Sequence, residues 1–230
     1  MLTELGFRGI IAINPPIVLT MLFLSILLVT VLLERIWTFL SSARWKESLW
    51  KQITDDIRSG RLHDARTLCV NKSNVYARVF YSIINSTNLS RADNEDLAQI
   101  EKENQQERLR KRLGLFATLA FVSPLIGLLG TVLGIMHAFH DLGRSGSGGA
   151  NIVASGISEA LITTAAGIIV AVPAAMLYNY FTYRLRGIVV RMNNYAQELV
   201  ILLYGGEETG YTKASLVQPK PGDPHAKTNR

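Results

Sequence analysis

Three long uncharged stretches constrain the fold of this chain more than any other feature of its sequence. The first runs from Gly9 to Leu33, the second from Leu113 to Phe139 and the third from Ala160 to Tyr183. Each exceeds the roughly 20 residues that an α-helix needs to cross the hydrocarbon core of a bilayer. Because strongly charged segments separate them, the sequence predicts an all-α integral membrane protein with three transmembrane helices.

The first stretch has one alternative interpretation, a cleaved signal peptide. Ser41–Ala43 would be a weak cleavage-like site. However, the apolar core is longer than a typical signal sequence, and the chain re-enters the membrane later. Pro15 and Pro16 suit the first turn of a helix, where a missing amide donor costs little. We therefore expect a retained transmembrane helix.

The distribution of Lys and Arg predicts the orientation. Residues 34–112 hold 15 of them, whereas the connection after the second stretch holds only Arg144 and the N-terminal segment only Arg8. Basic residues accumulate on the cytoplasmic side of membrane helices.

The expected divisions are a periplasmic N-terminus (1–14), transmembrane helix 1 (15–40), a cytoplasmic helical domain (41–112), transmembrane helix 2 (113–140), a periplasmic loop (141–152), transmembrane helix 3 (153–183), a cytoplasmic helical extension (184–204) and a disordered cytoplasmic tail (205–230).

Helical periodicity is expected within the cytoplasmic domain. Apolar residues recur at helical spacing at Trp45, Leu49, Ile53 and Ile57, and Gly60 is a plausible C-terminal stop. Ser90 offers a helix start, from which we expect one long helix that continues through the second span. The glycine- and serine-rich connection between the second and third spans is predicted to be a flexible loop.

Charge and cysteine content exclude several classes of function. A net charge of +6 could suggest a nucleic-acid partner, but the basic residues gather beside apolar segments and nothing resembles a recognition module. Cys69 is the only cysteine, so no intrachain disulfide and no cysteine-based metal site are expected. No nucleophile–base pair, metal-ligand cluster or phosphate loop is apparent. We therefore predict neither an enzyme nor a cofactor, and a transporter with its own substrate would need inverted repeats that are not found.

An acidic residue marks the third span. Glu159 lies at its edge, and Ser155, Glu159 and Thr163 are four residues apart, so they share one helix face. Thr164 lies on the flank of this stripe. An ionisable group inside a membrane is costly and usually functional. The alternative is a carboxylate that the helix dipole stabilises at a hydrated interface.

Small residues mark the second span. Gly127, Gly130 and Gly134 would let another helix approach closely, and packing alone is a sufficient reason for them. Thr131 lies among them, and it could simply donate a hydrogen bond back to the Gly127 carbonyl. In the third span, Pro173 removes one backbone hydrogen bond and invites a kink.

A single three-helix chain has too little wall to enclose a polar path. The small-residue faces of the second and third spans therefore predict a homo-oligomer in which these helices line a shared interior. The first span, rich in Leu, Ile and Val, would face membrane lipid.

Two sequence blocks carry a resemblance. Ser123-Pro-Leu-Ile-Gly-Leu-Leu-Gly-Thr-Val-Leu-Gly-Ile-Met136 and Gly156-Ile-Ser-Glu-Ala-Leu-Ile-Thr-Thr-Ala-Ala-Gly-Ile-Ile-Val-Ala-Val-Pro173 resemble the MotA/TolQ/ExbB proton channel family. The resemblance implies an ExbB- or TolQ-like subunit of the bacterial inner membrane. Its pore-lining polar residues would be Thr131, Glu159 and Thr164, and Pro173 matches the family's proline.

The same resemblance implies an assembly. Five copies would form a helical bundle around the single transmembrane helices of two copies of an ExbD/TolR-like single-span protein, whose Asp would carry the proton. Proton flow would energise a TonB/TolA-like protein. The alternative is a non-conducting membrane scaffold that only clusters partner helices.

Overall fold

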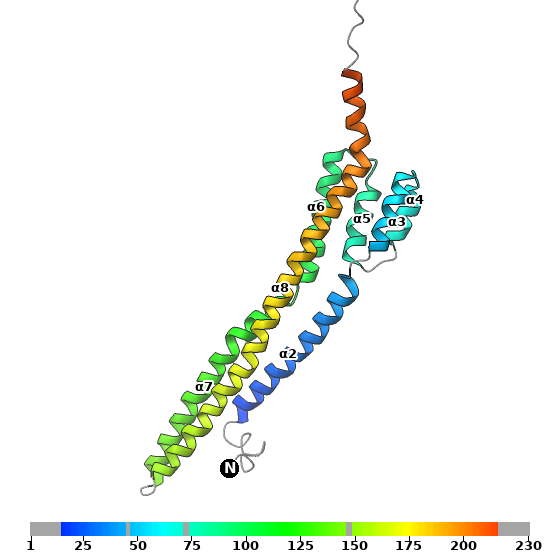
Figure 1. Cartoon of the computed structure of the whole chain (residues 1–230). Helices are drawn as coiled ribbons and strands as arrows, with labels where there is room; N and C mark the ends of the chain where they lie inside the picture. The colour runs from blue at the N-terminus through cyan, green and yellow to red at the C-terminus, as the bar shows by residue number, and fades with distance from the viewer. Residues whose placement is uncertain (1–14, 45–46, 71–73, 146–148, 216–230) are drawn as a thin grey trace, which may run out of the picture. The chain divides into compact units, whose positions relative to one another are not determined.

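The computed structural model describes residues 15–44, 47–70, 74–145 and 149–215 of the chain. The described residues are all-helical, as the sequence predicted, and the helices follow one another along the chain (Figure 1). The helices are α2 (Pro15–Ser42), α3 (Glu47–Arg58), α4 (Leu62–Val70), α5 (Val75–Asn85), α6 (Arg91–Arg110), α7 (Leu113–Ser145) and α8 (Gly149–Ser215). The expected periplasmic segment 1–14 and the tail after Ser215 lie outside the described residues.

The chain divides into two compact units. The first combines the residues up to Ser41 with Gln106–Ile188, and the second combines Ser42–Gln105 with Val189 onward. Three stretches of helix, within Pro16–Arg58, Arg91–Arg144 and Val153–Gly205, are long and apolar enough to cross a membrane. This confirms the three predicted spans, and their apolar parts lie in the first unit.

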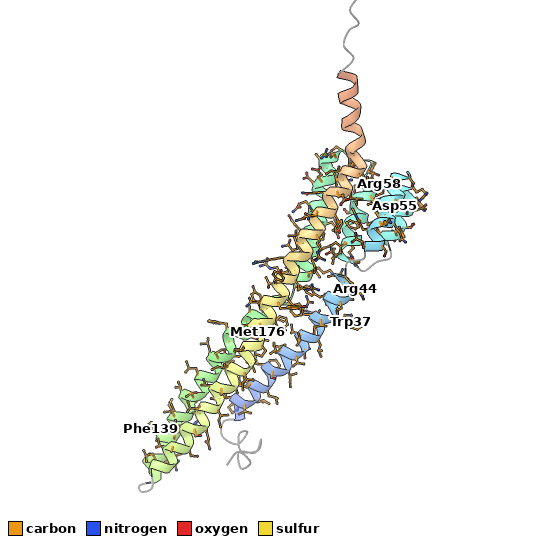
Figure 2. All side chains as sticks on the ribbon, viewed as in Figure 1. Trp37, Arg44, Asp55, Arg58, Phe139 and Met176 are labelled. Atoms are coloured by element: carbon orange, nitrogen blue, oxygen red, sulfur yellow. The ribbon has the colours of Figure 1, made fainter. Side chains whose placement is uncertain are left out.

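Within the first unit, α7 and α8 run antiparallel, side by side, and α2 packs alongside them (Figure 1). One face of α2 is buried, at Ile17, Met21, Leu28 and Val31. Large apolar side chains of α2 such as Leu19 and Phe23 are exposed, and Trp37 is 77% exposed (Figure 2). Such an apolar outer surface suits lipid, because in water it would be an aggregation hazard.

In the first unit, aromatic rings from α2, α7 and α8 pack against one another in a single cluster. The Phe181 ring of α8 lies 5.1 Å from the Phe39 ring of α2 and stacks on the Phe116 ring of α7 at 5.8 Å. Phe116 and Phe181 are buried. Offset and tilted contacts of this kind stabilise a core beyond the area that they bury.

The second unit has a compact apolar core. Trp50 on α3 packs against Phe80 on α5 at 5.2 Å and against Tyr195 on α8 at 4.7 Å. Gly60 follows α3 with a φ of +74°. This conformation favours glycine, so the predicted stop of this helix is confirmed.

One buried polar group organises the second unit. Asn94 on α6 is fully buried, and its amide nitrogen donates to the Ile83 carbonyl at 2.9 Å and to the Tyr204 hydroxyl at 3.0 Å. The Tyr204 hydroxyl in turn lies 3.2 Å from the carbonyls of Ser86 and Leu89. These bonds attach α8 to the turn between α5 and α6, since a buried polar group without partners would be costly.

Three expectations about helix ends are wrong. The single helix expected from residue 91 through the second span is broken at Lys111–Arg112, where Arg112 has a φ of +67°. Much of the loop expected at 141–152 is helical, because α7 extends to Ser145 and α8 begins at Gly149. The tail expected to be disordered from Gly205 continues α8 to Ser215. In the last two cases, a helix that packing has already nucleated extends at little cost through residues of weak propensity.

The Asn94 network yields a first prediction. Asn94→Ala should lower the free energy of unfolding by about 1–3 kcal/mol, because it leaves a buried carbonyl and a buried hydroxyl short of a partner. Thermal unfolding of the purified protein in detergent measures this. Asn104→Ala, at an exposed position of the same helix, is the matched control, and equal losses in both variants would contradict the account.

Candidate functional site

The contact between α7 and α8 is unusually close. A Cβ added at Gly127 would lie 2.9 Å from the Thr163 carbonyl oxygen, and one added at Gly134 would lie 2.8 Å from the Ala160 Cβ. Gly130 faces the Thr163 side chain at 2.5 Å by the same measure. All three glycines are buried. The structure therefore places the small-residue face of the second span directly on the third span of the same chain.

The approach is reciprocal, because α8 also presents glycines to α7. A Cβ added at Gly167 would lie 2.6 Å from the Ser123 carbonyl oxygen, and one at Gly156 would lie 2.5 Å from the Ala138 Cβ. Distances below 3.0 Å are not tolerated without a shift of the backbone. Hence the separation of the two helices is set along most of the membrane thickness by residues that have no side chain.

Threonine hydroxyls meet within this contact. Thr131 on α7 and Thr164 on α8 form a short hydrogen bond between their hydroxyl groups. Thr131 Oγ1 also donates to the Ala160 carbonyl at 3.0 Å, and Thr164 Oγ1 lies 3.1 Å from the Gly127 carbonyl. Both side chains are half-buried. Two residues that the sequence singled out, 33 positions apart, are thus in direct contact.

A third threonine completes the cluster. Thr163 is 7% exposed, and its hydroxyl lies 2.7 Å from the Ala160 carbonyl and 3.2 Å from the Gly127 carbonyl. Thr131 Oγ1 lies 3.3 Å from the same Gly127 oxygen, so its single proton can be donated either within α7 or across to α8. Sequence reasoning placed Thr163 on the Glu159 stripe but not in the site. Its position opposite Gly130 depends on the register between α7 and α8. The periodicity of a single helix does not reveal this register.

The three hydroxyls compete for few acceptors. Thr131, Thr163 and Thr164 all lie within hydrogen-bond distance of the Gly127 carbonyl oxygen, which has two lone pairs. The hydroxyl protons can therefore be distributed in more than one way among Gly127, Ala160 and the threonines themselves. A hydroxyl is both a donor and an acceptor. This cluster can consequently pass a hydrogen bond, or a proton, from one oxygen to the next without moving the backbone.

Glu159 lies beside this cluster but does not bond to it. Its carboxylate accepts from the Ser155 hydroxyl at 3.5 Å, along its own helix and toward the start of α8. The side chain is half-buried and precedes Ala160, whose carbonyl receives the Thr131 hydroxyl. The carboxylate is therefore the next polar group toward the α7–α8 turn after the threonines.

The prolines create further polar positions. Pro173 is an exposed residue inside α8, and Pro124 is a half-buried one inside α7. Because proline has no amide hydrogen, the carbonyls of Ile169 and Ala120 lack their usual helical donors. Next to Pro124, the Ser123 side chain is completely buried, and its hydroxyl has no hydrogen-bond partner among the described residues.

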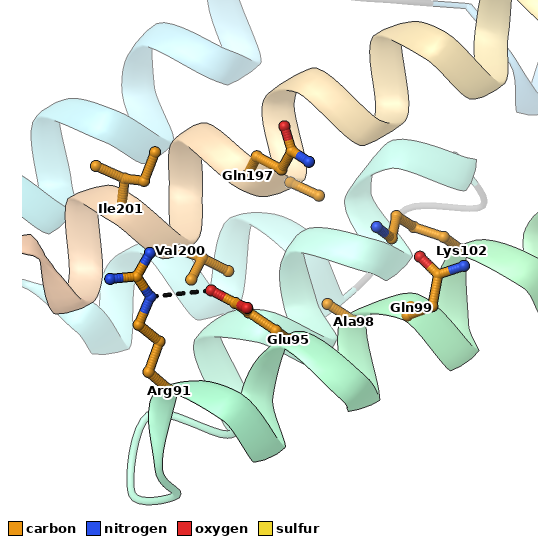
Figure 3. A pocket seen from close by; sticks show the side chains of 9 residues that line it. Arg91, Glu95, Ala98, Gln99, Lys102, Gln197, Val200 and Ile201 are labelled. Atoms are coloured by element: carbon orange, nitrogen blue, oxygen red, sulfur yellow. Dashed lines mark hydrogen bonds and ion pairs between the residues drawn. The ribbon is translucent and has the colours of Figure 1, made fainter.

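A separate pocket of about 370 Å³ lies in the second unit, between α6 and α8 (Figure 3). Arg91 Nε and Glu95 Oε1 form an ion pair of 2.9 Å at its edge. Lys102 also lines it, and burial lowers the pKa of this ammonium group, while Glu103 and Glu95 oppose the shift. The pocket contains none of the residues that the sequence singled out.

The fold and site define a class of protein: a three-span membrane protein whose second and third spans form a glycine-packed pair with hydroxyl groups at its centre. The model of the MotA/TolQ/ExbB proton channel family matches residues 71–194, more than half of the chain. The chain belongs to this family, as the two motif blocks predicted.

Individual relatives are similar over shorter segments. The Tol-Pal system protein TolQ of Haemophilus influenzae is 45% identical over 98 residues, which cover 43% of this chain and 43% of TolQ. The biopolymer transport protein ExbB of Salmonella typhimurium is 31% identical over 160 residues, 62% of this chain and 65% of that relative. The biopolymer transport protein ExbB of Aquifex aeolicus is 44% identical over 89 residues, which cover 39% of this chain and 57% of that relative. The chain thus spans less than two thirds of each of these relatives.

The glycine contacts yield a second prediction. Gly167→Ala should destabilise the first unit by about 1–3 kcal/mol, because the new methyl group would overlap the Ser123 carbonyl. Thermal unfolding in detergent measures the loss.

Gly187→Ala is the matched control on the same helix, because nothing in the described structure lies within 4 Å of a Cβ added there. It should be neutral or slightly stabilising, since alanine favours a helix by about 1 kcal/mol over glycine. If Gly187→Ala were less stable to heat than Gly167→Ala, the packing account would be contradicted.

Proposed function

We propose that this ExbB/TolQ-type motor subunit forms a proton-conducting stator in the bacterial inner membrane. It would surround an ExbD/TolR-like single-span partner and couple the proton motive force to a TonB/TolA-like protein. Import across the outer membrane or maintenance of the envelope would be the result. The observation that carries the proposal is the half-buried hydroxyl pair of Thr131 and Thr164 at the centre of the two spans.

The site supports proton transfer better than transport of a larger solute. Where α7 and α8 meet most closely, the polar side chains are the hydroxyls of Thr131, Thr163 and Thr164, with the Glu159 carboxylate beside them and small residues between them. Such a lining offers exchangeable hydrogen bonds but little room. An Asp on the partner helix would be the proton carrier. Its protonation removes a charge, so that its helix can pass an apolar wall at much lower cost.

The available energy is sufficient for such a cycle. One elementary charge that crosses a potential of 100 mV releases about 2.3 kcal/mol. Reversing a two-state population from 1:99 to 99:1 requires roughly 5.5 kcal/mol. Three protons, which release about 6.9 kcal/mol, could therefore drive one decisive conformational step of the partner.

The oligomer and the topology are part of the proposal. The first unit has exposed apolar side chains on all three of its long helices, including Phe23, Leu129 and Met176. Neighbouring copies and lipid would cover them, and five copies would enclose a conduit for the partner helices. With the positive-inside rule, the N-terminus would be periplasmic and the C-terminus cytoplasmic.

A scaffold that only clusters partner helices is the rival function. It would need the glycine contacts of α7 and α8 but not the hydroxyl groups at their centre. The two functions therefore differ in what they require of Thr131, and a change that removes only its hydroxyl distinguishes them.

Thr131→Val is the first test, because valine keeps the shape of threonine without its hydroxyl. We expect proton uptake to fall to the background of empty vesicles, in vesicles that contain the chain with its co-purified single-span partner. Complex assembly, measured by size and subunit ratio, should persist.

Thr118→Val is the matched control on the same helix. Thr118 is exposed, and its hydroxyl donates to the Gly114 carbonyl of its own helix at 3.0 Å. Normal proton uptake by Thr131→Val would favour the scaffold, and an equal loss in Thr118→Val would remove the special role of the cluster.

Glu159→Gln is the second test, since it removes the charge but keeps the size. Proton uptake should again fall strongly, because the conduit loses its acidic group near the outer end. Asp141→Asn, an exposed carboxylate near the end of α7, should have little effect. Wild-type uptake by Glu159→Gln would refute the role assigned to this carboxylate.

A further inference from the structure

An arginine is buried at the end of the first span. Arg35 on α2 is only 4% exposed. Arginines near the ends of membrane helices ordinarily extend their guanidinium group to water. Here Nη1 instead donates to the Leu109 carbonyl at 3.2 Å and to the Lys111 carbonyl at 2.7 Å. A side chain of the first span thus binds backbone of the segment that leads into the second span.

These carbonyls lie at a break in the helix. α6 ends at Arg110, α7 begins at Leu113, and Arg112 between them has a φ of +67°. Non-glycine residues adopt this left-handed conformation only where the surroundings impose it. The last carbonyls of a helix lack intrahelical donors and carry negative partial charge, so a cation is a favourable partner.

A carboxylate completes the arrangement. Glu34 accepts from Arg35 Nε at 2.6 Å and also from Arg35 Nη2. The same carboxylate forms an ion pair with Arg112 Nη1 at 3.2 Å and accepts from the Thr38 hydroxyl at 3.1 Å. Glu34 therefore orients the buried guanidinium and contacts the left-handed residue itself. All these groups belong to the first unit.

We propose that Arg35 is a positioning residue of the channel: it clamps the junction that leads from α6 into α7 to α2, and so fixes the start of the helix that carries Thr131. The clamp comprises Arg35, Glu34, Arg112 and the two carbonyls. The proposal rests on the proposed function, because α7 is the helix that would line the conduit. The Phe39–Phe181–Phe116 cluster follows the clamp by about one helical turn along α2 and α7 and joins both helices to α8.

Hydrogen exchange tests the clamp in the full chain with its co-purified partner, embedded in lipid nanodiscs. Arg35→Ala should speed the exchange of backbone amides in residues 107–116 by about tenfold or more, because local opening becomes easier. Arg35→Lys keeps the charge but cannot bond both carbonyls and Glu34 with a planar fork. It should therefore remain faster than wild type.

Arg110→Ala is the matched control, since Arg110 is an exposed arginine of the same segment. It should leave the exchange unchanged. Unchanged exchange in Arg35→Ala, or an equal increase in Arg110→Ala, would overturn the clamp.

A second pair of variants tests the backbone conformation. Arg112→Gly accommodates the positive φ but removes the ion pair with Glu34, so it should speed exchange and lower proton uptake less than Arg112→Pro, which forbids that φ. Equal behaviour of the two variants would overturn a role for the left-handed break.

Proton uptake then links the clamp to function. Arg35→Ala should reduce uptake several-fold with Thr131 and Glu159 intact, and full uptake despite fast exchange would overturn the positioning role. Failure of the wild-type complex to take up protons would instead refute the proposed function, while the exchange result would still decide on the clamp.

Discussion

The backbone-to-backbone approach of α7 and α8 is the constraint on which the rest of the structure depends. Gly127 and Gly167 bring the two helices so close that a single methyl group would collide with the opposite backbone, and one at Gly130 would collide with the Thr163 side chain. Only at this separation can the Gly127 carbonyl receive hydroxyls from the neighbouring helix as well as its own. The glycines therefore account both for the close packing of α7 and α8 and for the hydrogen bonds between them.

This arrangement would reconcile two opposite requirements of the proposed proton path in a membrane. Polar groups in hydrocarbon need partners within the protein, and the threonines find them in the carbonyls of Gly127 and Ala160. A proton relay, however, needs hydrogen bonds that can switch from one partner to another. Because three hydroxyls share few acceptors, the cluster is satisfied and still has alternative arrangements. The buried Arg35 applies the same principle at the end of the first span, where it satisfies carbonyls that a helix break has exposed.

The sequence was sufficient for features that composition and spacing determine locally. Uncharged length predicts the three spans, and the Gly60 stop follows from a preference of the backbone itself. The break at Arg112 was not predictable, because Lys111–Arg112 contains neither glycine nor proline, and the Lys111 carbonyl there is bound by Arg35, which is distant in the sequence. Thr163 was missed as a site residue for the same reason. Its role is set by the register of α8 on Gly130, a tertiary property that helical periodicity does not encode.

A structure of the assembled complex in lipid, with the partner helix included, tests the central claim most directly. The account predicts that the paired hydroxyls of Thr131 and Thr164 and the Glu159 carboxylate face a guest helix inside a ring of several copies. Those side chains turned toward lipid, or a ring with no guest helix at its centre, would contradict it.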